Sequence, residues 1–232
     1  MRHIILDTET TGLNPMTGDR IVEIGCVEMV NRRLTGNHLH YYINPERDVP
    51  ESAVNVHGLT AEFLSDKPLF SSIADEIMSF VKDAEVVIHN APFDLGFLDM
   101  EFKLLKKPIF SKQIKRVIDT LAEARQMFPG KRNNLDALCE RFDIRNNHRT
   151  FHGALLDAEL LAEVYLSMTR GQNDLTIDMA SAGDASIEDT FSKIQIPKDL
   201  IVLQASSDEN LEHEKVLEEI AKKSKKETIW QS

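Results

Sequence analysis

The chain opens with a short apolar run, residues 3–6, that leads directly into two carboxylates, Asp7 and Glu9, with one threonine between them. A run of this kind predicts a buried strand, and alternate residues of a strand point to the same face. Asp7 and Glu9 are therefore expected side by side at the end of a hydrophobic element, roughly 7 Å apart by strand geometry. Two like charges at that spacing weaken a fold unless bound cations neutralise them.

Hydrophobic periodicity predicts an α/β fold in which helices flank a mixed sheet. Three strand-like runs come first, with short connections that indicate an antiparallel meander, and two further runs alternate with helical patterns. The predicted strands are residues 4–6, 20–30, 38–45, 85–90 and the start of 116–121, with a turn at 31–37. The predicted helices are residues 71–81, 95–105, 133–142 and 154–168, and one that ends at Pro129 and Gly130.

Composition excludes several classes of protein. The net charge of −11 argues against a protein that grips nucleic acid through a broad basic surface, but it is compatible with an enzyme that meets nucleic acid through cations. Cys26 and Cys139 lie in apolar patterns, which argues against a disulfide scaffold. No signal peptide or run of membrane-spanning length occurs, so we expect a soluble, cytoplasmic protein with no membrane contact.

The character of the sequence changes near Gly171, which predicts three segments. Residues 1–171 carry the periodic patterns of a folded domain. Residues 172–198 are small and polar with little periodicity, as in a flexible linker. Residues 199–232 form a tail with a short apolar patch and a charged, helix-prone stretch. The tail contains too few apolar residues for a core of its own.

Further carboxylates follow later elements. Asp94 comes just after the predicted strand at 85–90, where ligands bind on open sheets. Asp157 falls on the core-facing stripe of the last helix, where a lone aspartate is costly unless it is paired or binds a metal. His152 lies five positions earlier. Convergence of these groups with Asp7 and Glu9 would suit two ions of Mg²⁺ or Mn²⁺, the usual clamp for attack on a phosphodiester.

Each of these residues also has an ordinary structural interpretation. An Asp-x-Glu pair is common at a solvated strand end. Asp94 could cap the helix that follows it, Asp157 could interact with the dipole of a first helical turn, and His152 could be a surface histidine. These separate interpretations do not explain why all five residues occur together at the ends of predicted strands and the start of a predicted helix.

Three segments, "LDTETTG", "HNAPFDLGFL" and "HGALLDAELLAEVY", resemble the exonuclease motifs of the DEDDh superfamily of 3′–5′ exonucleases, in the same order. The resemblance implies a ribonuclease H-like fold, here a mixed five-stranded sheet with a flexible C-terminal tail. It also implies that two divalent cations are held by Asp7, Glu9, Asp94 and Asp157. His152 matches the histidine that activates the attacking water in that superfamily.

The segments "VNRRLTG" and "VHGLTAEFLSDKP" and the end "IW" resemble the epsilon family of proofreading subunits of bacterial DNA polymerase III. That resemblance implies removal of mispaired nucleotides from a DNA 3′ end. The substrate would be contacted by Asp7, Glu9, Glu51, His57 and Asp157, although the spacing to Glu51 is one residue longer here. Phe93 and Phe97 could stack on the terminal bases, and the position of Phe97 in its helix also fits the core.

The same resemblance implies protein partners. The tail at 199–232 would bind the polymerase alpha subunit, and a small theta-type subunit could bind the exonuclease domain. The segment "QNDLTI", residues 172–177, resembles peptides that dock on bacterial sliding clamps, with Leu175 and Ile177 in an apolar pocket and Gln172 in polar contacts. Ile177 stands where an aromatic residue is often found, so weak binding is expected.

Two other functions are compatible with the same residues. A free-standing DEDDh exoribonuclease that trims RNA 3′ ends would use the same catalytic set, although it would have no need of the long tail. A structural adaptor of the polymerase could carry an inactive nuclease site, although the presence of all five predicted catalytic residues argues against an inactive site.

Overall fold

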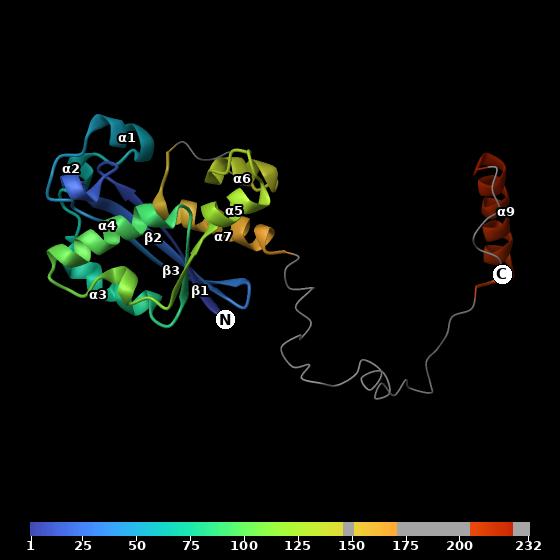
Figure 1. Ribbon diagram of the computed structural model, residues 1–232, viewed down its shortest axis with the longest axis horizontal. Coiled ribbons are helices and arrows are strands. Elements are labelled where there is room, and N and C mark those ends of the chain that lie inside the picture. Colours follow the sequence, from blue (N-terminus) through green and yellow to red (C-terminus); the bar gives the residue numbers. More distant parts are fainter. Residues whose placement is uncertain (146–150, 171–204, 225–232) are drawn as a thin grey trace, which may run out of the picture. The chain divides into compact units, whose positions relative to one another are not determined.

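The computed structural model describes residues 1–145, 151–170 and 205–224 (Figure 1). The chain divides into two compact units, Met1–Ile177 and Asp178–Ser232. The whole predicted linker, residues 172–198, lies outside the described residues, and with it Gln172, Leu175 and Ile177 of the predicted clamp-binding segment.

The first unit is built on a five-stranded sheet in the order β3-β2-β1-β4-β5. Its strands are β1 (Arg2–Thr10), β2 (Ile21–Val30), β3 (Arg33–Tyr42), β4 (Glu85–Ile88) and β5 (Arg116–Asp119). The strand β2 pairs antiparallel with β1 and β3, whereas β4 pairs parallel with β1 and β5. The predicted meander and the predicted mixed sheet are both confirmed.

The start of β3 was predicted wrongly, because the expected turn at 31–37 is much shorter. The hairpin turns at Asn31 and Arg32 alone, which both have positive φ, as two-residue hairpin loops require. Residues 33–38 are exposed on an edge strand, so they carry no alternation of apolar and polar side chains that could mark a strand.

Helices cover both faces of the sheet. They are α1 (Glu51–His57), α2 (Ala61–Leu64), α3 (Phe70–Val81), α4 (Ala91–Leu104), α5 (Thr120–Met127), α6 (Leu135–Arg141) and α7 (Ala154–Met168). Two 3-10 turns, η1 (Pro15–Thr17) and η2 (Phe110–Lys112), complete the unit. The predicted helices are confirmed. The sequence interpretation missed α1 and α2, since each buries a single side chain, His57 and Leu64 respectively.

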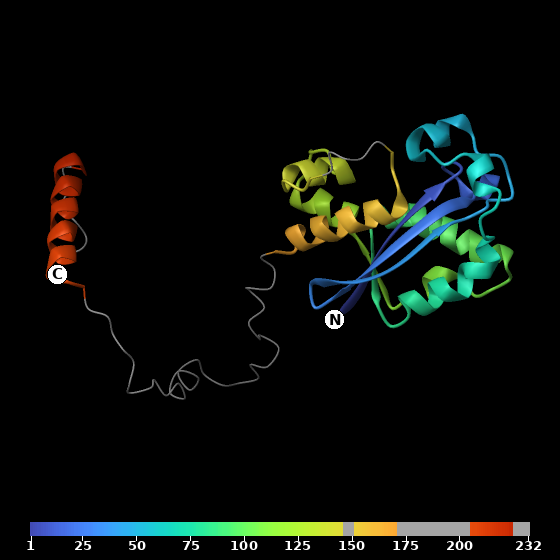
Figure 2. The same ribbon diagram turned by 180° about the vertical axis from the view of Figure 1, so that it is seen from behind.

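The strand β1 is buried on both faces, which explains its continuous apolar run. Ile4 and Leu6 pack on the side of α3 and α4, visible in front of the sheet in Figure 1. Ile5 packs on the opposite side against Ala158 and Leu161 of α7, which crosses the sheet in Figure 2. The carboxyl end of β1 is therefore held between two helical layers.

Gly25 of β2 lets the start of α7 approach the sheet. A Cβ atom at this position would lie 2.3 Å from the backbone nitrogen of Leu155 and 2.4 Å from the carbonyl carbon of Ala154. Gly25 is also the partner of Asp7 in the β1–β2 ladder. The absence of a side chain at Gly25 therefore brings the first turn of α7 close to the strand that carries Asp7.

Gly25→Ala is expected to destabilise the protein by about 1–3 kcal/mol, because the backbone of α7 cannot move aside as a flexible side chain would. Urea unfolding of the metal-free protein measures this change. Gly96→Ala is the matched control, since its added Cβ would meet only Pro15 Cγ at 3.8 Å and alanine favours the α4 helix. Equal stability of the two variants would contradict the close-approach argument.

The second unit contains α9 (Ser207–Ser224) in its described part. The helix begins with a capping box, in which the Ser206 N–H donates to Glu209 Oε2 at 2.8 Å and the Glu209 N–H donates to Ser206 Oγ at 3.3 Å. Leu211, Val216 and Ile220 of α9 are about half exposed. None of the described helices is long and apolar enough to cross a membrane.

Candidate active site

A pocket of about 210 Å³ lies at the carboxyl end of β1, and it collects every residue of the predicted catalytic set. The elements that meet there are β1, the turn after β4, the starts of α4 and α6, and the segment that leads into α7. The lining residues are Asp7, Thr8, Glu9, His89, Phe93, Asp94, Asn134, Leu135, Asp136, His152 and Asp157. We call this space the catalytic pocket.

Asp94 is attached to β1 by a residue that sequence reasoning missed. The backbone N–H of Thr8 donates to Asp94 Oδ1 at 3.1 Å, and the Thr8 hydroxyl donates to the same oxygen at 2.7 Å. Asp94 is only 3 % exposed, and burial raises the pKa of its carboxyl to about 7 although the Thr8 hydrogen bonds act in the opposite direction. A bound cation would hold such a buried acid ionised.

The turn between β4 and α4 places Asp94 in the pocket. Asn90 adopts the left-handed conformation with φ of 67°, and its N–H donates to Asp119 Oδ1 at 3.2 Å. The helix α4 then starts at Ala91, so Asp94 lies within its first turn. Asp94 is thus not the N-cap of this helix, and its carboxylate contacts β1.

Asp157 and His152 approach the pocket from the start of α7. Gly153 is the N-cap residue of α7, and Asp157 is 3 % exposed in its first turn. The distance from His152 Nδ1 to Asp157 Oδ2 is 3.4 Å. Ligand atoms of Glu9, His152 and Asp157 all lie within 4.8 Å of one another. Two carboxylates and one imidazole at this spacing could hold a divalent cation.

A second pocket of about 390 Å³ adjoins the catalytic pocket, with which it shares Thr8, Glu9 and Phe93. We call it the apolar slot. It lies between the loop after β1 and the helix α1, and its other lining residues are Thr10, Gly12, Leu13, Ser52, Ala53, Val56 and His57. Phe93 thus lines both spaces, whereas Phe97 is 1 % exposed in the core.

His57 is buried at the end of α1. Its Nδ1 accepts the Leu59 N–H at 3.0 Å, which places the ring proton on Nε2. Burial lowers the pKa of His57, so the ring is a neutral donor near pH 7. Glu51 lies exposed at the first position of α1 and lines neither space, so its contact with substrate stays a prediction.

Sequence comparisons identify the family. The sequence model of the Exonuclease family matches residues 4–165. The DNA polymerase III subunit epsilon of Pasteurella multocida is 50 % identical over 236 residues, covering 99 % of this chain and 93 % of that protein. The protein of the same name from Escherichia coli strain K12 is 50 % identical over 232 residues, with coverage of 96 % and 94 %. This chain belongs to the epsilon family of exonucleases.

Solved structures agree with the fold of this epsilon-family chain. Exonuclease X in complex with 5′ overhanging duplex DNA matches with a TM-score of 0.58 and 23 % identity, covering 74 % of this chain and 93 % of that one. A structure of exonuclease I matches with a TM-score of 0.66 and 18 % identity, covering 75 % and 42 %. The ribonuclease H-like fold, the 3′–5′ exonuclease activity and the proofreading family that the motifs predicted are confirmed.

In this epsilon-family chain, residues 151 and 152 are held in place by contacts with α1 and the glycine that follows it. The His152 N–H donates to the Val56 carbonyl at 3.0 Å. The ring of Phe151 lies on Gly58, where an added Cβ would meet the ring carbons at 3.1 Å and φ is +75°. The helix that lines the apolar slot therefore also supports the histidine of the catalytic pocket, a link that no local sequence pattern indicates.

Proposed function

We propose that this chain hydrolyses the terminal phosphodiester at a DNA 3′ end and removes mispaired nucleotides as the proofreading subunit of a replicative polymerase. The observation that carries the proposal is the convergence of four carboxylates and one histidine, from three separate motifs, in one pocket. The relatives are named as polymerase subunits, which favours DNA as substrate over the RNA of a free-standing trimming enzyme.

The carboxylates of the catalytic pocket would hold two divalent cations, Mg²⁺ or Mn²⁺. The proposed ligands are Asp7, Glu9, Asp94 and Asp157. When bound, such ions neutralise the acidic cluster and stabilise the charge that develops on the phosphate. His152 would accept the proton of the attacking water, since its side chain is 46 % exposed and neutral imidazole is an effective base near pH 7.

The apolar slot would receive the last nucleoside of the strand. The side chains of Leu13, Val56 and Phe93 offer apolar surface to a base, and Glu9 joins the slot to the catalytic pocket. A paired 3′ end must first unstack to enter such a space, and a mispaired end does so at a lower cost. Selection of mismatches would thus follow from melting, without readout of base edges.

The decisive experiment compares nucleotide release from matched DNA and RNA oligonucleotides with a paired or a mispaired 3′ end. Release is expected in Mg²⁺ or Mn²⁺, to be lost with a chelator, and to be faster from the mispaired DNA. Faster release from RNA would favour the trimming exoribonuclease. If no nucleotide is released from any substrate with Mg²⁺ or Mn²⁺, the structural adaptor with an inactive nuclease site would be the remaining hypothesis.

The proposed division of the chain assigns separate contacts to its parts. Residues 1–171 would form the exonuclease domain and could also bind a theta-type subunit. Residues 172–198 would form a linker with a weak clamp contact, and residues 199–232 would bind the polymerase alpha subunit. Val216 and Ile220 of α9 support the last assignment, because they are about half exposed and lie four positions apart on one face of the helix, where they offer apolar side chains to a partner.

Truncation after Gly171 is therefore expected to leave an active exonuclease that no longer joins its polymerase. Co-purification with the alpha subunit measures the loss, and release of nucleotides from a single strand measures the retained activity. Replacing Val216 and Ile220 together by serine in the full chain is a finer test. A truncated protein that binds the alpha subunit at full strength would contradict the proposed division.

A further inference from the structure

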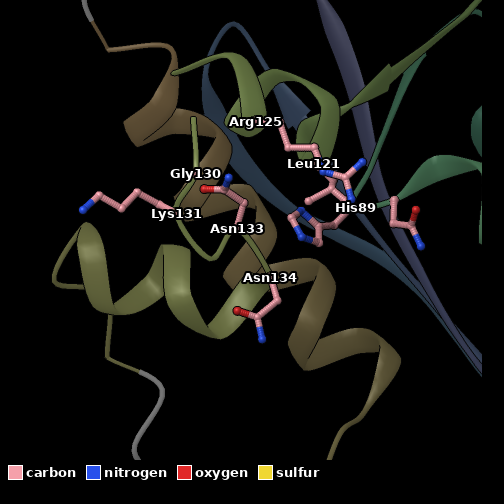
Figure 3. Close-up of a pocket in the computed structure, with 8 residues that line it drawn as sticks. His89, Leu121, Arg125, Gly130, Lys131, Asn133 and Asn134 are labelled. Atoms are coloured by element: carbon pink, nitrogen blue, oxygen red, sulfur yellow. The ribbon is translucent and has the colours of Figure 1, made fainter. Parts of the chain in front are cut away.

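A polar pocket of about 640 Å³ lies beside the catalytic pocket and is used by no step described above (Figure 3). We call it the outer pocket. Figure 3 shows Arg125 and Leu121 of α5, with Asn133 and Asn134 ahead of α6, around the ring of His89. Its lining residues are His89, Asn90, Leu121, Arg125, Gly130, Lys131, Asn133 and Asn134.

The three spaces have a definite order. The outer pocket shares His89 and Asn134 with the catalytic pocket, and it shares no lining residue with the apolar slot. The slot meets the catalytic pocket on the side of Glu9 and Phe93. The catalytic pocket therefore lies between the other two. In the proposed function, the last nucleoside of the strand fills the slot and the scissile phosphate lies at the carboxylates. The nucleotides on the 5′ side of that phosphate would then extend toward the outer pocket.

The chemistry of the outer pocket is opposite to that of the catalytic pocket. Arg125 and Lys131 are exposed cations, and the residues that line the space include no carboxylate. The chain as a whole has a net charge of −11, so two cations in a lining without a carboxylate stand out from the average surface, although Asp119 lies behind the lining and accepts the Asn90 N–H at 3.2 Å. Guanidinium and ammonium groups are the usual protein ligands of phosphate oxygens.

The floor of the outer pocket is fixed by its own hydrogen bonds. The Asn133 amide donates to the Phe128 carbonyl at 3.2 Å and accepts from Arg141 at 3.1 Å. The Nδ1 atom of His89 lies 2.9 Å from the Thr120 hydroxyl, and burial lowers the pKa of this ring. His89 is thus neutral near pH 7. The positive charge of the pocket comes from Arg125 and Lys131 alone.

We propose that the outer pocket binds the phosphodiester backbone of the substrate strand on the 5′ side of the scissile bond. This inference rests on the proposed function, because it takes the slot and the catalytic pocket as the places of the last nucleoside and the scissile phosphate. Arg125 and Lys131 pair with phosphates without reading sequence. These two side chains would attract the anionic strand to an otherwise acidic protein even before divalent cations are bound.

The test compares the variant R125A/K131A with the wild type on a 12-nucleotide strand and on a dinucleotide. The dinucleotide has only the scissile phosphodiester, so it gains nothing from the outer pocket. On the longer strand, KM is expected to rise at least about tenfold with kcat nearly unchanged, as for loss of charge-assisted contacts made equally before and during the reaction. On the dinucleotide, both constants are expected to match the wild type.

Salt dependence gives an independent readout. Each phosphate contact to a single strand contributes about 0.7 to the slope of log affinity against log salt concentration, so the double variant should lower that slope by about 1.4. Binding of a fluorescent 12-nucleotide strand in a chelating buffer measures the slope without catalysis. The control variant R33A/K103A removes the same charge from exposed positions on β3 and at the end of α4. It should retain nearly the full slope.

An unchanged salt slope in R125A/K131A, or an equal loss on the dinucleotide, would overturn the assignment of the outer pocket. An equal loss in R33A/K103A would do so too, because the effect would then be one of net charge. If the wild type releases no nucleotide from either substrate, the proposed function fails. The binding measurement would still decide whether the outer pocket holds a strand.

Discussion

Asp157→Asn is expected to lower metal-dependent nucleotide release at least about 10³-fold, because a bound divalent cation contributes several kcal/mol to stabilisation of the developing charge. Asp157 is 3 % exposed in the first turn of α7, and asparagine has nearly the same shape, so the fold should be retained. The unfolding midpoint without metal should stay equal or rise, since the substitution removes one charge from an acidic cluster. Steady-state release in Mg²⁺ and thermal unfolding in a chelating buffer measure the two effects.

Asp83→Asn is the matched control for the removal of charge. Asp83 is exposed after α3 and has a positive φ of 61°, a conformation that asparagine also adopts easily. Activity of this variant should equal that of the wild type. Retention of wild-type turnover by Asp157→Asn in both Mg²⁺ and Mn²⁺ would remove Asp157 from the proposed set of ligands.

The parts of the site that could be predicted lie on elements with strong local signals. The placement of Asp7 and Glu9 followed from the alternation of side chains along β1, which depends on strand geometry alone. Asp157 was placed by the helical stripe it shares with Leu160 and Leu161 on α7, which are both buried. In each case the candidate site residue belongs to the same periodic pattern as the core residues around it.

The missed parts depend on contacts between distant segments. Thr8 holds Asp94 across 86 positions of sequence, and no local pattern marks that pairing. The helix α1 buries only His57, so it has no apolar stripe by which it could be recognised. Its contact with the His152 segment arises from the tertiary fold. Arg125 and Lys131 come from α5 and the loop that follows it, and they line the same space only in the folded chain, where the Lys131 side chain extends away from His89 at the rim (Figure 3).

The structure leaves two roles for His152 that a single variant can separate. As a proton acceptor, the ring would act on water and contribute nothing to metal affinity. As a ligand, it would bind the cation together with Glu9 and Asp157, whose donor atoms lie within 4.8 Å of it and of one another. The exposed fraction of the His152 side chain, 46 %, favours the first role, because a solvent-facing ring can exchange protons with water.

His152→Ala is therefore expected to lower kcat about 10²–10⁴-fold, the usual contribution of a general base, while Mn²⁺ affinity changes little. The decline of wild-type activity on the acid side, where imidazole becomes protonated, should be weaker in the variant. His38→Ala removes an exposed histidine of β3 and should leave both properties unchanged. A large loss of Mn²⁺ affinity in His152→Ala would make His152 a metal ligand. An unaltered kcat with an unaltered pH profile would exclude it from the reaction, and the proton of the attacking water would then need another acceptor in the catalytic pocket.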